Sequence, residues 1–358
     1  MPDPTVLTVV GNRPQYIKGA ALSPALRGRV RELLLDTGQH YDHELAGVFF
    51  EQLDLPRPDV SLGVGSGSHA EQTAQVMAGV ERTILELEPD LVLVFGDTNS
   101  TLGAALAAVK LHVPVAHVEA GLRSFDRQMP EEVNRVLTDT VSALLFCPTV
   151  TAVENLRREG IVEGVHLVGD VMFDLALRML APHVEESVLS RFGLQAGGYV
   201  FATVHRPANA DDPERLGAIL GVLDGRGEPV LFAAHPRTRA TLETAALLDS
   251  SPARLRVVDP VGYVESLALI KNARAVVTDS GGVQKEAYVL RTPCVTVRDT
   301  SEWVETIESG WNVLVDADPA ALGAALDAAA PGHTWTAFYG EGDAGERIAA
   351  IVAGFLGA

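Results

Sequence analysis

The sequence predicts an α/β fold built from two similar domains that face a cleft. Short apolar runs alternate with longer amphipathic segments, a pattern typical of parallel strands connected by helices. The alternation begins again after Gly169, and 358 residues are enough for two ordinary domains. Hydrophobic residues make up 47% of the chain, so each domain can bury a core. We therefore expect two Rossmann-like domains, at residues 1–168 and 169–340, whose strands point their carboxyl ends into the cleft.

Apolar runs indicate the strands, and the amphipathic segments between them indicate the helices. The strands expected in the first half are 6–10, 32–36, 91–95, 113–118 and 143–147. Those expected in the second half are 199–204, 229–234, 255–258, 275–278 and 294–297. The clearest helical segments are 71–87, 101–110, 213–223, 264–271 and 283–290. Residues 166–180 are expected to form the crossover between the halves, and the alanine-rich stretch 317–330 a surface helix.

Charge and cysteine content exclude several classes of protein. The formal net charge of −19 argues against a general binder of nucleic acid or anionic membranes, because both need a basic surface. A small anionic ligand is compatible, since a few local cations can make one pocket positive. Cys147 and Cys294 lie in separate apolar runs, so we expect buried free thiols and a cytoplasmic protein. We find no zinc-site spacing, no signal peptide and no apolar run long enough to span a bilayer.

Three carboxylates come after two neighbouring strands of the first half. Asp97 follows the run 91–95 in Gly-Asp-Thr, and Glu119 follows the run 113–118 in His-Val-Glu-Ala-Gly-Leu-Arg. Glu131 comes close behind, in Pro-Glu-Glu-Val-Asn-Arg. Open parallel sheets place their ligands at such strand ends. Acids grouped there indicate acid–base chemistry rather than packing.

A glycine turn follows the first strand and opens a helix, beginning at Gly11. Backbone N–H groups and the positive end of a helix meet at such a turn and can bind a phosphate. Arg13 and Lys18 add positive charge there. The alternative is an ordinary turn between strand and helix with surface cations. The glycine-rich segment 63–68 lacks the G-x-G-x-x-G spacing of a dinucleotide site, so we expect a flexible loop there.

A second candidate phosphate site follows the strand 275–278. Ser280, Gly281 and Gly282 open the next helix, so hydroxyl and N–H donors can meet a phosphate at its N-terminus. Glu286 lies in the first turns of that helix and can accept both hydroxyls of a ribose. The alternative is a capped helix with a glycine turn.

Two histidines lie at strand ends. His205 follows the first strand of the second half and can neutralise a leaving phosphate or shuttle a proton. A lone histidine in such a place is more often structural, but the neighbouring Arg206 favours a functional role. His117 we interpret as a structural histidine whose ring is satisfied within the fold.

Taken together, these segments resemble the non-hydrolysing UDP-N-acetylglucosamine 2-epimerases over nearly the whole chain. The motifs that carry the resemblance, in order, are Gly-x-Arg-Pro-x-x-x-Lys (11–18), Gly-Asp-Thr (96–98), His-Val-Glu-Ala-Gly-Leu-Arg (117–123), Pro-Glu-Glu-x-Asn-Arg (130–135), His-Arg (205–206) and Asp-Ser-Gly-Gly-x-Gln-x-Glu (279–286). The resemblance implies a glycosyltransferase-B-like fold, a homodimer, and no requirement for a metal ion or NAD. It also implies that a last helix, at about 341–358, packs back on the first domain.

The resemblance further implies a UDP-sugar substrate whose UDP is held mainly by the second domain. Positions that match UDP-contacting residues of the family are Arg13, His205, Ser280, Gly281, Gly282 and Glu286. Asp97, Glu119 and Glu131 match the family's catalytic carboxylates, and Lys18 matches a lysine of the substrate site. We place His205 and Lys18 with the catalytic residues as well. The implied reaction interconverts UDP-GlcNAc and UDP-ManNAc.

Three departures from the family pattern leave the identity of the sugar open. Gln15 stands where UDP-GlcNAc enzymes commonly have Glu, and Ala208 stands where they often have Glu. Trp303, in the segment 302–305, replaces an arginine near the substrate. Gln15 and Trp303 look like the related epimerases of UDP-2,3-diacetamido-2,3-dideoxy-glucuronate, a substrate with an added carboxylate. A glycosyltransferase of the same fold and a non-catalytic sugar-nucleotide sensor are the remaining alternatives.

Overall fold

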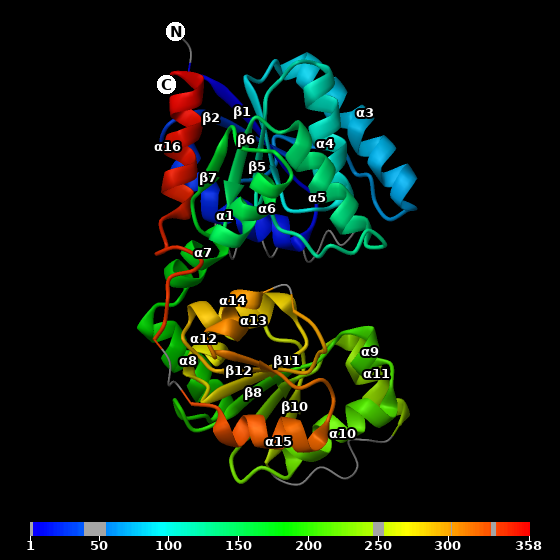
Figure 1. The fold of residues 1–358 in the computed structure, drawn as a ribbon, viewed down its shortest axis with the longest axis vertical. Coiled ribbons are helices and arrows are strands. Elements are labelled where there is room, and N and C mark those ends of the chain that lie inside the picture. Colours follow the sequence, from blue (N-terminus) through cyan, green and yellow to red (C-terminus); the bar gives the residue numbers. More distant parts are fainter. Residues whose placement is uncertain (1–2, 39–54, 246–253, 302, 331–333) are drawn as a thin grey trace. The chain divides into compact units, whose positions relative to one another are not determined.

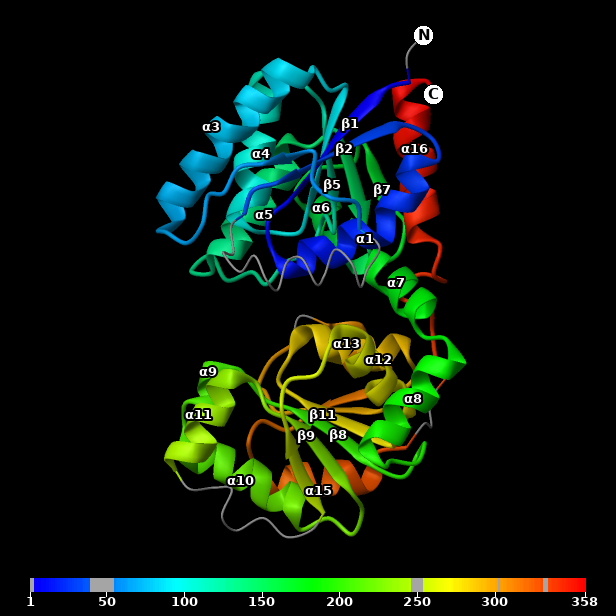
Figure 2. The same cartoon turned by 180° about the vertical axis from the view of Figure 1, so that it is seen from behind.

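The computed structural model describes residues 3–38, 55–245, 254–301, 303–330 and 334–358. The chain forms two compact units and passes from one to the other twice (Figures 1 and 2). The N-terminal unit comprises Met1–Leu177 and Phe338–Ala358, and the C-terminal unit comprises Arg178–Ala337. The units divide later than the expected boundary at 168/169, because most of the helix that follows the last strand of the first sheet belongs to the N-terminal unit.

The N-terminal unit is built on one parallel sheet of seven strands, in the order β3-β2-β1-β4-β5-β6-β7. The strands are β1 (Thr5–Val10), β2 (Arg31–Asp36), β3 (Val60–Ser61), β4 (Leu91–Phe95), β5 (Val115–Val118), β6 (Leu144–Cys147) and β7 (Val165–Leu167). The chain order reverses between β1 and β4, so the segments that follow these two strands meet at a topological switch point. The glycine turn at Gly11 and the Asp97 turn are these two segments.

Helices cover both faces of this sheet. They are α1 (Arg13–Arg27), α3 (His69–Leu87), α4 (Asn99–Lys110), α5 (Pro130–Val141), α6 (Val150–Arg158), α7 (Val171–Met179) and α16 (Ala344–Leu356). Helices α3, α4 and α5 gather on one side, and α16 packs against α1 on the other (Figures 1 and 2). Every residue of β4 is buried, as expected for a central parallel strand covered on both faces.

The C-terminal unit repeats the plan with six parallel strands, in the order β10-β9-β8-β11-β12-β13. The strands are β8 (Val200–Thr203), β9 (Val230–Ala233), β10 (Leu255–Val258), β11 (Ala275–Thr278), β12 (Cys294–Thr296) and β13 (Asn312–Leu314). The helices are α8 (Pro182–Phe192), α9 (Pro207–Ala210), α10 (Pro213–Asp224), α11 (Pro236–Thr244), α12 (Tyr263–Asn272), α13 (Gly281–Val289), α14 (Val304–Glu308) and α15 (Pro319–Ala328). The switch point lies between β8 and β11, where His205 and Ser280 follow.

The α/β class with two parallel sheets is confirmed, and each strand expected from an apolar run is present. The sequence missed β3, β7 and β13, which are short strands at the sheet edges. The alanine-rich stretch forms α15, and the expected crossover contains the end of β7 and all of α7. None of the helices within the described ranges combines the length and the apolar character needed to cross a bilayer.

Candidate active site

The first part of the candidate site lies at the carboxyl edge of the N-terminal sheet. Asp97 lies in the turn between β4 and α4, Glu119 follows β5 directly, and Glu131 is the second residue of α5. Asn134 of α5 donates from Nδ2 to the backbone carbonyl of Asp97 at 2.9 Å, which ties the start of α5 to the Asp97 turn. The structure therefore brings together the segments that carry all three acids.

Glu119 pairs with Lys18, which reaches it from α1 across 101 positions of sequence. Both side chains are largely buried, with 10% and 12% of their surface exposed. A Cβ atom at Gly96 would lie 3.3 Å from Lys18 Nζ and 3.5 Å from Glu119 Oε2, so the Asp97 turn passes directly beside this pair. Glu119 itself has a φ of 71°, in the left-handed region that non-glycine residues rarely adopt.

Asp97 forms an ion pair with Arg135 of α5. Arg135 also contacts Glu132, with 3.3 Å between Nη1 and Oε2. The two sequence candidates Asp97 and Glu119 are thus each matched to a cation from another element of the same unit. Such fixed partners hold acid groups in one position, as acid–base chemistry requires.

The structure separates the two adjacent glutamates of the Pro-Glu-Glu motif. Glu132 is buried and accepts hydrogen bonds from Ser124 N at 2.8 Å, Ser124 Oγ at 2.9 Å and Phe125 N at 3.0 Å. Its oxygens thus hold the loop that precedes α5. Glu131 is exposed to solvent at the first turn of the helix. Of the two, Glu131 is the carboxylate that a substrate can reach.

The glycine turn at the start of α1 is closely packed. A Cβ atom at Gly11 would lie 2.0 Å from Thr37 Oγ1 and 2.6 Å from Ser100 Oγ, so only glycine fits. Asn12 caps α1, because its side-chain oxygen accepts a hydrogen bond from the backbone N–H of Gln15. Arg13 is the first residue of the helix and is exposed. A helix N-terminus with an exposed arginine is suited to a phosphate group.

Gln15 does not lie on an open surface. It is 2% exposed, and its Nε2 donates to Phe95 O at 2.9 Å and to Thr98 Oγ1 and Thr101 Oγ1 at 3.0 Å each. An ionised glutamate could not donate to the Phe95 carbonyl. Gln15 therefore fixes the turn that carries Asp97, and its effect on the sugar would be indirect.

The second part of the candidate site lies at the carboxyl edge of the C-terminal sheet. Ser280 is the N-cap of α13 and accepts a hydrogen bond from Val283 N at 3.4 Å. Gly281 and Gly282 form the first turn, and a Cβ atom on Gly282 would meet only Ser280 Oγ, at 3.9 Å. Glu286 is half-buried in the second turn. This N-terminus leaves room for a phosphate beside its backbone N–H groups.

Asp279 is a residue of this site that the sequence did not single out. It is fully buried, and it accepts from His205 N at 3.0 Å, Arg206 N at 2.9 Å and Asn209 Nδ2 at 3.1 Å. The loops that follow β8 and β11 are therefore locked together. The signal available in the sequence was an acidic residue directly after a buried strand.

The His205 imidazole lies 3.8 Å from Asp279 and 5.7 Å, between ring centroids, from His235. Burial lowers the pKa of His205; Asp279 opposes this shift, while His235 and Arg206 add to it. Without a bound anion, the ring therefore favours its neutral form near pH 7. A neutral imidazole can accept a proton and then stabilise an anionic phosphate.

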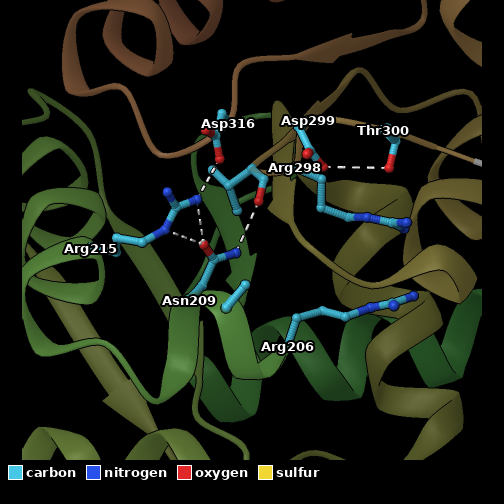
Figure 3. A pocket seen from close by; sticks show the side chains of 9 residues that line it. Arg206, Asn209, Arg215, Arg298, Asp299, Thr300 and Asp316 are labelled. Atoms are coloured by element: carbon cyan, nitrogen blue, oxygen red, sulfur yellow. Dashed lines mark hydrogen bonds and ion pairs between the residues drawn. The ribbon is translucent and has the colours of Figure 1, made fainter.

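A cavity of about 440 Å³ lies beside these loops (Figure 3). It is lined by Arg206, Ala208, Asn209, Arg215, Arg298 and Asp316, among others. Arg215 donates to Asn209 Oδ1 from Nε at 3.2 Å and pairs with Asp316. Three arginines and two aspartates, Asp299 and Asp316, line this cavity, which we call the arginine pocket.

Trp303 is buried, and Lys285 Nζ lies 4.7 Å from the centroid of the Trp303 ring in a cation–π contact. Glu302, the neighbouring residue of the same segment, lies outside the described residues. The free cysteines Cys147 and Cys294 are buried in the two sheets, and burial raises the pKa of each thiol to about 12. They are core residues, as the sequence indicated.

No group of three or more His, Cys, Asp and Glu side chains that could hold a metal ion occurs in the part of the chain that the structure describes. The candidate phosphate-binding features are the N-terminus of α1 with Arg13 in one unit, and the N-terminus of α13 with His205 in the other. The three candidate catalytic acids Asp97, Glu119 and Glu131 belong to the N-terminal unit.

Comparison with known proteins gives one consistent family. The family model described as UDP-N-acetylglucosamine 2-epimerase matches residues 25–353. A UDP-N-acetylglucosamine 2-epimerase homolog of Methanococcus maripaludis is 45% identical, and the match covers 97% of this chain and 99% of that protein. The UDP-2,3-diacetamido-2,3-dideoxy-D-glucuronate 2-epimerase of Pseudomonas aeruginosa is 46% identical over 87% of this chain and 88% of its own length.

A solved structure agrees with these relatives. The crystal structure of Methanocaldococcus jannaschii UDP-GlcNAc 2-epimerase, in complex with UDP-GlcNAc and UDP, has a TM-score of 0.85 and 41% identity. The match covers 97% of this chain and 99% of that one, and it confirms the glycosyltransferase-B-like fold. The chain therefore belongs to the UDP-N-acetylglucosamine 2-epimerase family and is a UDP-sugar 2-epimerase, an isomerase.

Proposed function

We propose that the protein interconverts UDP-GlcNAc and UDP-ManNAc. The observation that carries this proposal is the group of three acid-bearing segments at one sheet edge, where Glu119 pairs with Lys18 and Asp97 with Arg135. Epimerisation at C2 needs a proton removed from one face of the sugar and another delivered to the opposite face. Two faces need two proton-transfer groups, and this sheet edge supplies three candidates.

The chemistry proceeds by elimination and re-addition. A base takes the C2 proton, the electrons of the C2–H bond form a C1=C2 double bond, and the C1–O bond breaks with its electron pair going to UDP. Positive character at C1 acidifies C2, and nearby carboxylates stabilise that developing charge. The 2-acetamidoglucal is then protonated at C2 from the other face, and the UDP oxygen adds back to C1.

The C-terminal unit is proposed to hold the UDP. The open N-terminus of α13 at Ser280–Gly282 would bind the diphosphate, and Glu286 would accept the ribose hydroxyls. His205 is held beside this turn by Asp279, and a neutral ring there can take up a proton as the phosphate departs. Arg13 and Lys18 of the N-terminal unit stay predicted substrate-binding residues. The homodimer, the cytoplasmic location and the independence from metal and NAD stay predictions.

Deuterium exchange tests the reaction directly. With UDP-GlcNAc in D2O, we expect UDP-ManNAc to form and deuterium to enter at C2 of both sugars, read by mass spectrometry and proton NMR. A matched incubation with UDP-2,3-diacetamido-2,3-dideoxy-glucuronate compares the two candidate substrates. Exchange with neither, together with sugar transfer to an added acceptor, would indicate a glycosyltransferase and contradict the proposal.

The second candidate substrate, the diacetamido-glucuronate, is favoured by the arginine pocket. That sugar carries a carboxylate, and Arg206, Arg215 and Arg298 line a cavity that adjoins the Asp279–Ser280 turn. Ala208 keeps this cavity free of a further acidic side chain. A Pseudomonas aeruginosa relative with this substrate in its name is 46% identical. Both sugars are therefore compared as substrates in each activity assay.

The variant Ala208→Glu separates the two candidates. A carboxylate added beside the arginines repels a sugar carboxylate by about 1–4 kcal/mol at 4 Å, depending on the local dielectric. We expect kcat/KM for the diacetamido-glucuronate to fall at least about tenfold, while kcat/KM for UDP-GlcNAc changes little. Ala208→Gln is the matched control, because it adds the same bulk without charge. Equal losses in both variants would assign the effect to bulk and not to charge.

A further inference from the structure

The buried histidine of β5 has more than a structural part in the fold. His117 is fully buried, and its two ring nitrogens lie 2.7 Å from Asp139 Oδ1 and 2.7 Å from the backbone carbonyl of Gly96. A carbonyl oxygen can only accept a hydrogen bond, so Nε2 donates to Gly96. An ionised carboxylate also only accepts, so Nδ1 donates to Asp139. A ring that donates from both nitrogens is an imidazolium.

Asp139 is the ionised partner that this arrangement needs. Burial raises the pKa of Asp139, but the charges and hydrogen bonds of His117 and Arg123 outweigh that effect and lower it overall. Arg123 Nη1 donates to Asp139 Oδ2 at 2.7 Å, and the same oxygen accepts from Gly121 N at 3.1 Å. Arg123 also forms two hydrogen bonds of 2.7 Å with Glu159, the residue directly after α6. The Asp139 carboxylate therefore has three close partners, His117, Arg123 and the Gly121 amide.

This network touches each segment that bears a candidate acid. Gly96 immediately precedes Asp97, and His117 and Gly121 flank Glu119 on either side. Asp139 belongs to α5, the helix that begins with Pro130 and Glu131. One buried imidazolium and one carboxylate thus connect the β4 turn, the β5 turn and α5 through hydrogen bonds of 3.1 Å or less.

The backbone at Glu119 has an unfavourable conformation that such a hydrogen-bond network can hold in place. Glu119 and Gly121 have φ angles of 71° and 79°, and Gly96 has a φ of 61°. A non-glycine residue in this region costs about 1–3 kcal/mol and persists only where its surroundings fix it. The Asp139 bond to Gly121 N fixes the chain just after the strained glutamate, and the His117 bond to Gly96 O fixes the neighbouring turn after β4.

We propose that His117, as an imidazolium paired with Asp139, is a positioning residue that sets Asp97, Glu119 and Glu131 relative to one another. The proposal rests on the proposed function, because it concerns the placement of the acids that carry out that reaction. A buried ion pair is a costly way to gain stability, since well-packed apolar residues of similar volume often stabilise a core as well or better. The His117–Asp139 pair is instead explained by its geometry, because it holds the β4 turn, the β5 turn and α5 in fixed positions.

The first test compares His117→Gln with His166→Gln. Glutamine carries its N–H donors on a single nitrogen, so it can replace one of the two ring hydrogen bonds but not both, and it carries no charge. The acid-bearing segments therefore lose their common anchor. We expect kcat to fall at least about 30-fold, with KM within about threefold, because small misplacements of reacting groups cost up to about 100-fold in rate. His166, on the edge strand β7, is half-buried and lies outside the network, and its variant should keep full activity.

A folded His117→Gln protein with normal kcat would overturn the proposal, even if its melting temperature were lowered. Substrate affinity lost together with kcat would also contradict it, because a general collapse of the site would then be the cause. Far-UV circular dichroism and UDP binding to both variants establish that the fold and the C-terminal unit are intact.

The second test uses the wild-type enzyme, so it does not depend on whether a variant folds. Histidine labelled with ¹⁵N in the wild-type enzyme reports ring protonation: an imidazolium gives two similar ring-nitrogen shifts, whereas a neutral ring gives two widely separated ones. We expect one slowly exchanging, buried ring to show the imidazolium pattern, because both of its nitrogens face acceptors. A neutral pattern for His117 would overturn the proposal. This readout is independent of turnover, so absence of exchange with either sugar would count against the proposed function alone.

Discussion

Replacing Asp97 with Asn, or Glu119 or Glu131 with Gln, is expected to lower kcat by about 10²–10⁴-fold in either direction of the reaction. Each substitution keeps the shape of the side chain and removes a group that can take or give a proton, and positioned general acids and bases contribute about that factor. Glu119 and Asp97 also lose their ion pairs with Lys18 and Arg135, so their variants should lie at the upper end of the range. Epimerisation and C2 deuterium exchange, measured together, report the loss.

The matched control for these variants is Glu154→Gln on α6. Glu154 pairs with Arg157 on the surface of the same unit, and loss of an exposed pair of this kind has little effect. Comparing exchange with net epimerisation also separates the two faces of the sugar. A variant that still exchanges the C2 proton but forms no epimer has lost the group that acts on the second face. Normal turnover in all three acid variants would contradict the mechanism.

Asp139→Ala is expected to destabilise the N-terminal unit by about 3–5 kcal/mol. The substitution leaves the His117 ring and the Arg123 guanidinium, whose side chains are 0% and 1% exposed, without the carboxylate that both contact. Removing one partner from a buried pair has a cost of this size, because an uncompensated charge stays in the interior. Since Gly121 N also loses its acceptor, the turn after Glu119 loosens.

Two optical probes can assign that loss to one unit. The chain has three tryptophans, Trp303, Trp311 and Trp335, and all belong to the C-terminal unit. Their fluorescence follows that unit during urea unfolding, whereas far-UV circular dichroism follows both. We expect an earlier transition in circular dichroism with the fluorescence transition unchanged. Asp343→Ala, at an exposed position of the N-terminal unit whose side chain caps no helix, should move neither transition.

The central strands could be predicted from the sequence because burial on both faces leaves a local signal, a short run of apolar residues. A strand such as β4, buried on both faces, must be apolar throughout, and its ends are marked by the polar residues of the site. The edge strands β3, β7 and β13 have two or three residues each and are partly exposed. Their strand character comes from pairing with a neighbour, which no local pattern reports.

The difference between local and long-range signals also explains which features of the site could be predicted from the sequence. Asp97, Glu119 and Glu131 were visible as acids near strand ends, but their partners lie far away in sequence. Lys18 and Glu119 are 101 positions apart, and the Asp279 side chain binds the backbone of Arg206 73 positions before it. Sequence reasoning also marked Gln15 as a determinant of the sugar, whereas its buried contacts with the Asp97 turn became visible only in the fold.

The return of α16 to α1 has a consequence for synthesis. The C-terminal unit is complete once residue 337 has been added, while the N-terminal unit still lacks the helix whose Ile348 and Val352 become part of its buried surface. Domains ordinarily fold in the order in which the ribosome makes them. Here the unit that begins first is finished last, so α1 gains the helix that packs against it only after every strand of the other unit has been made.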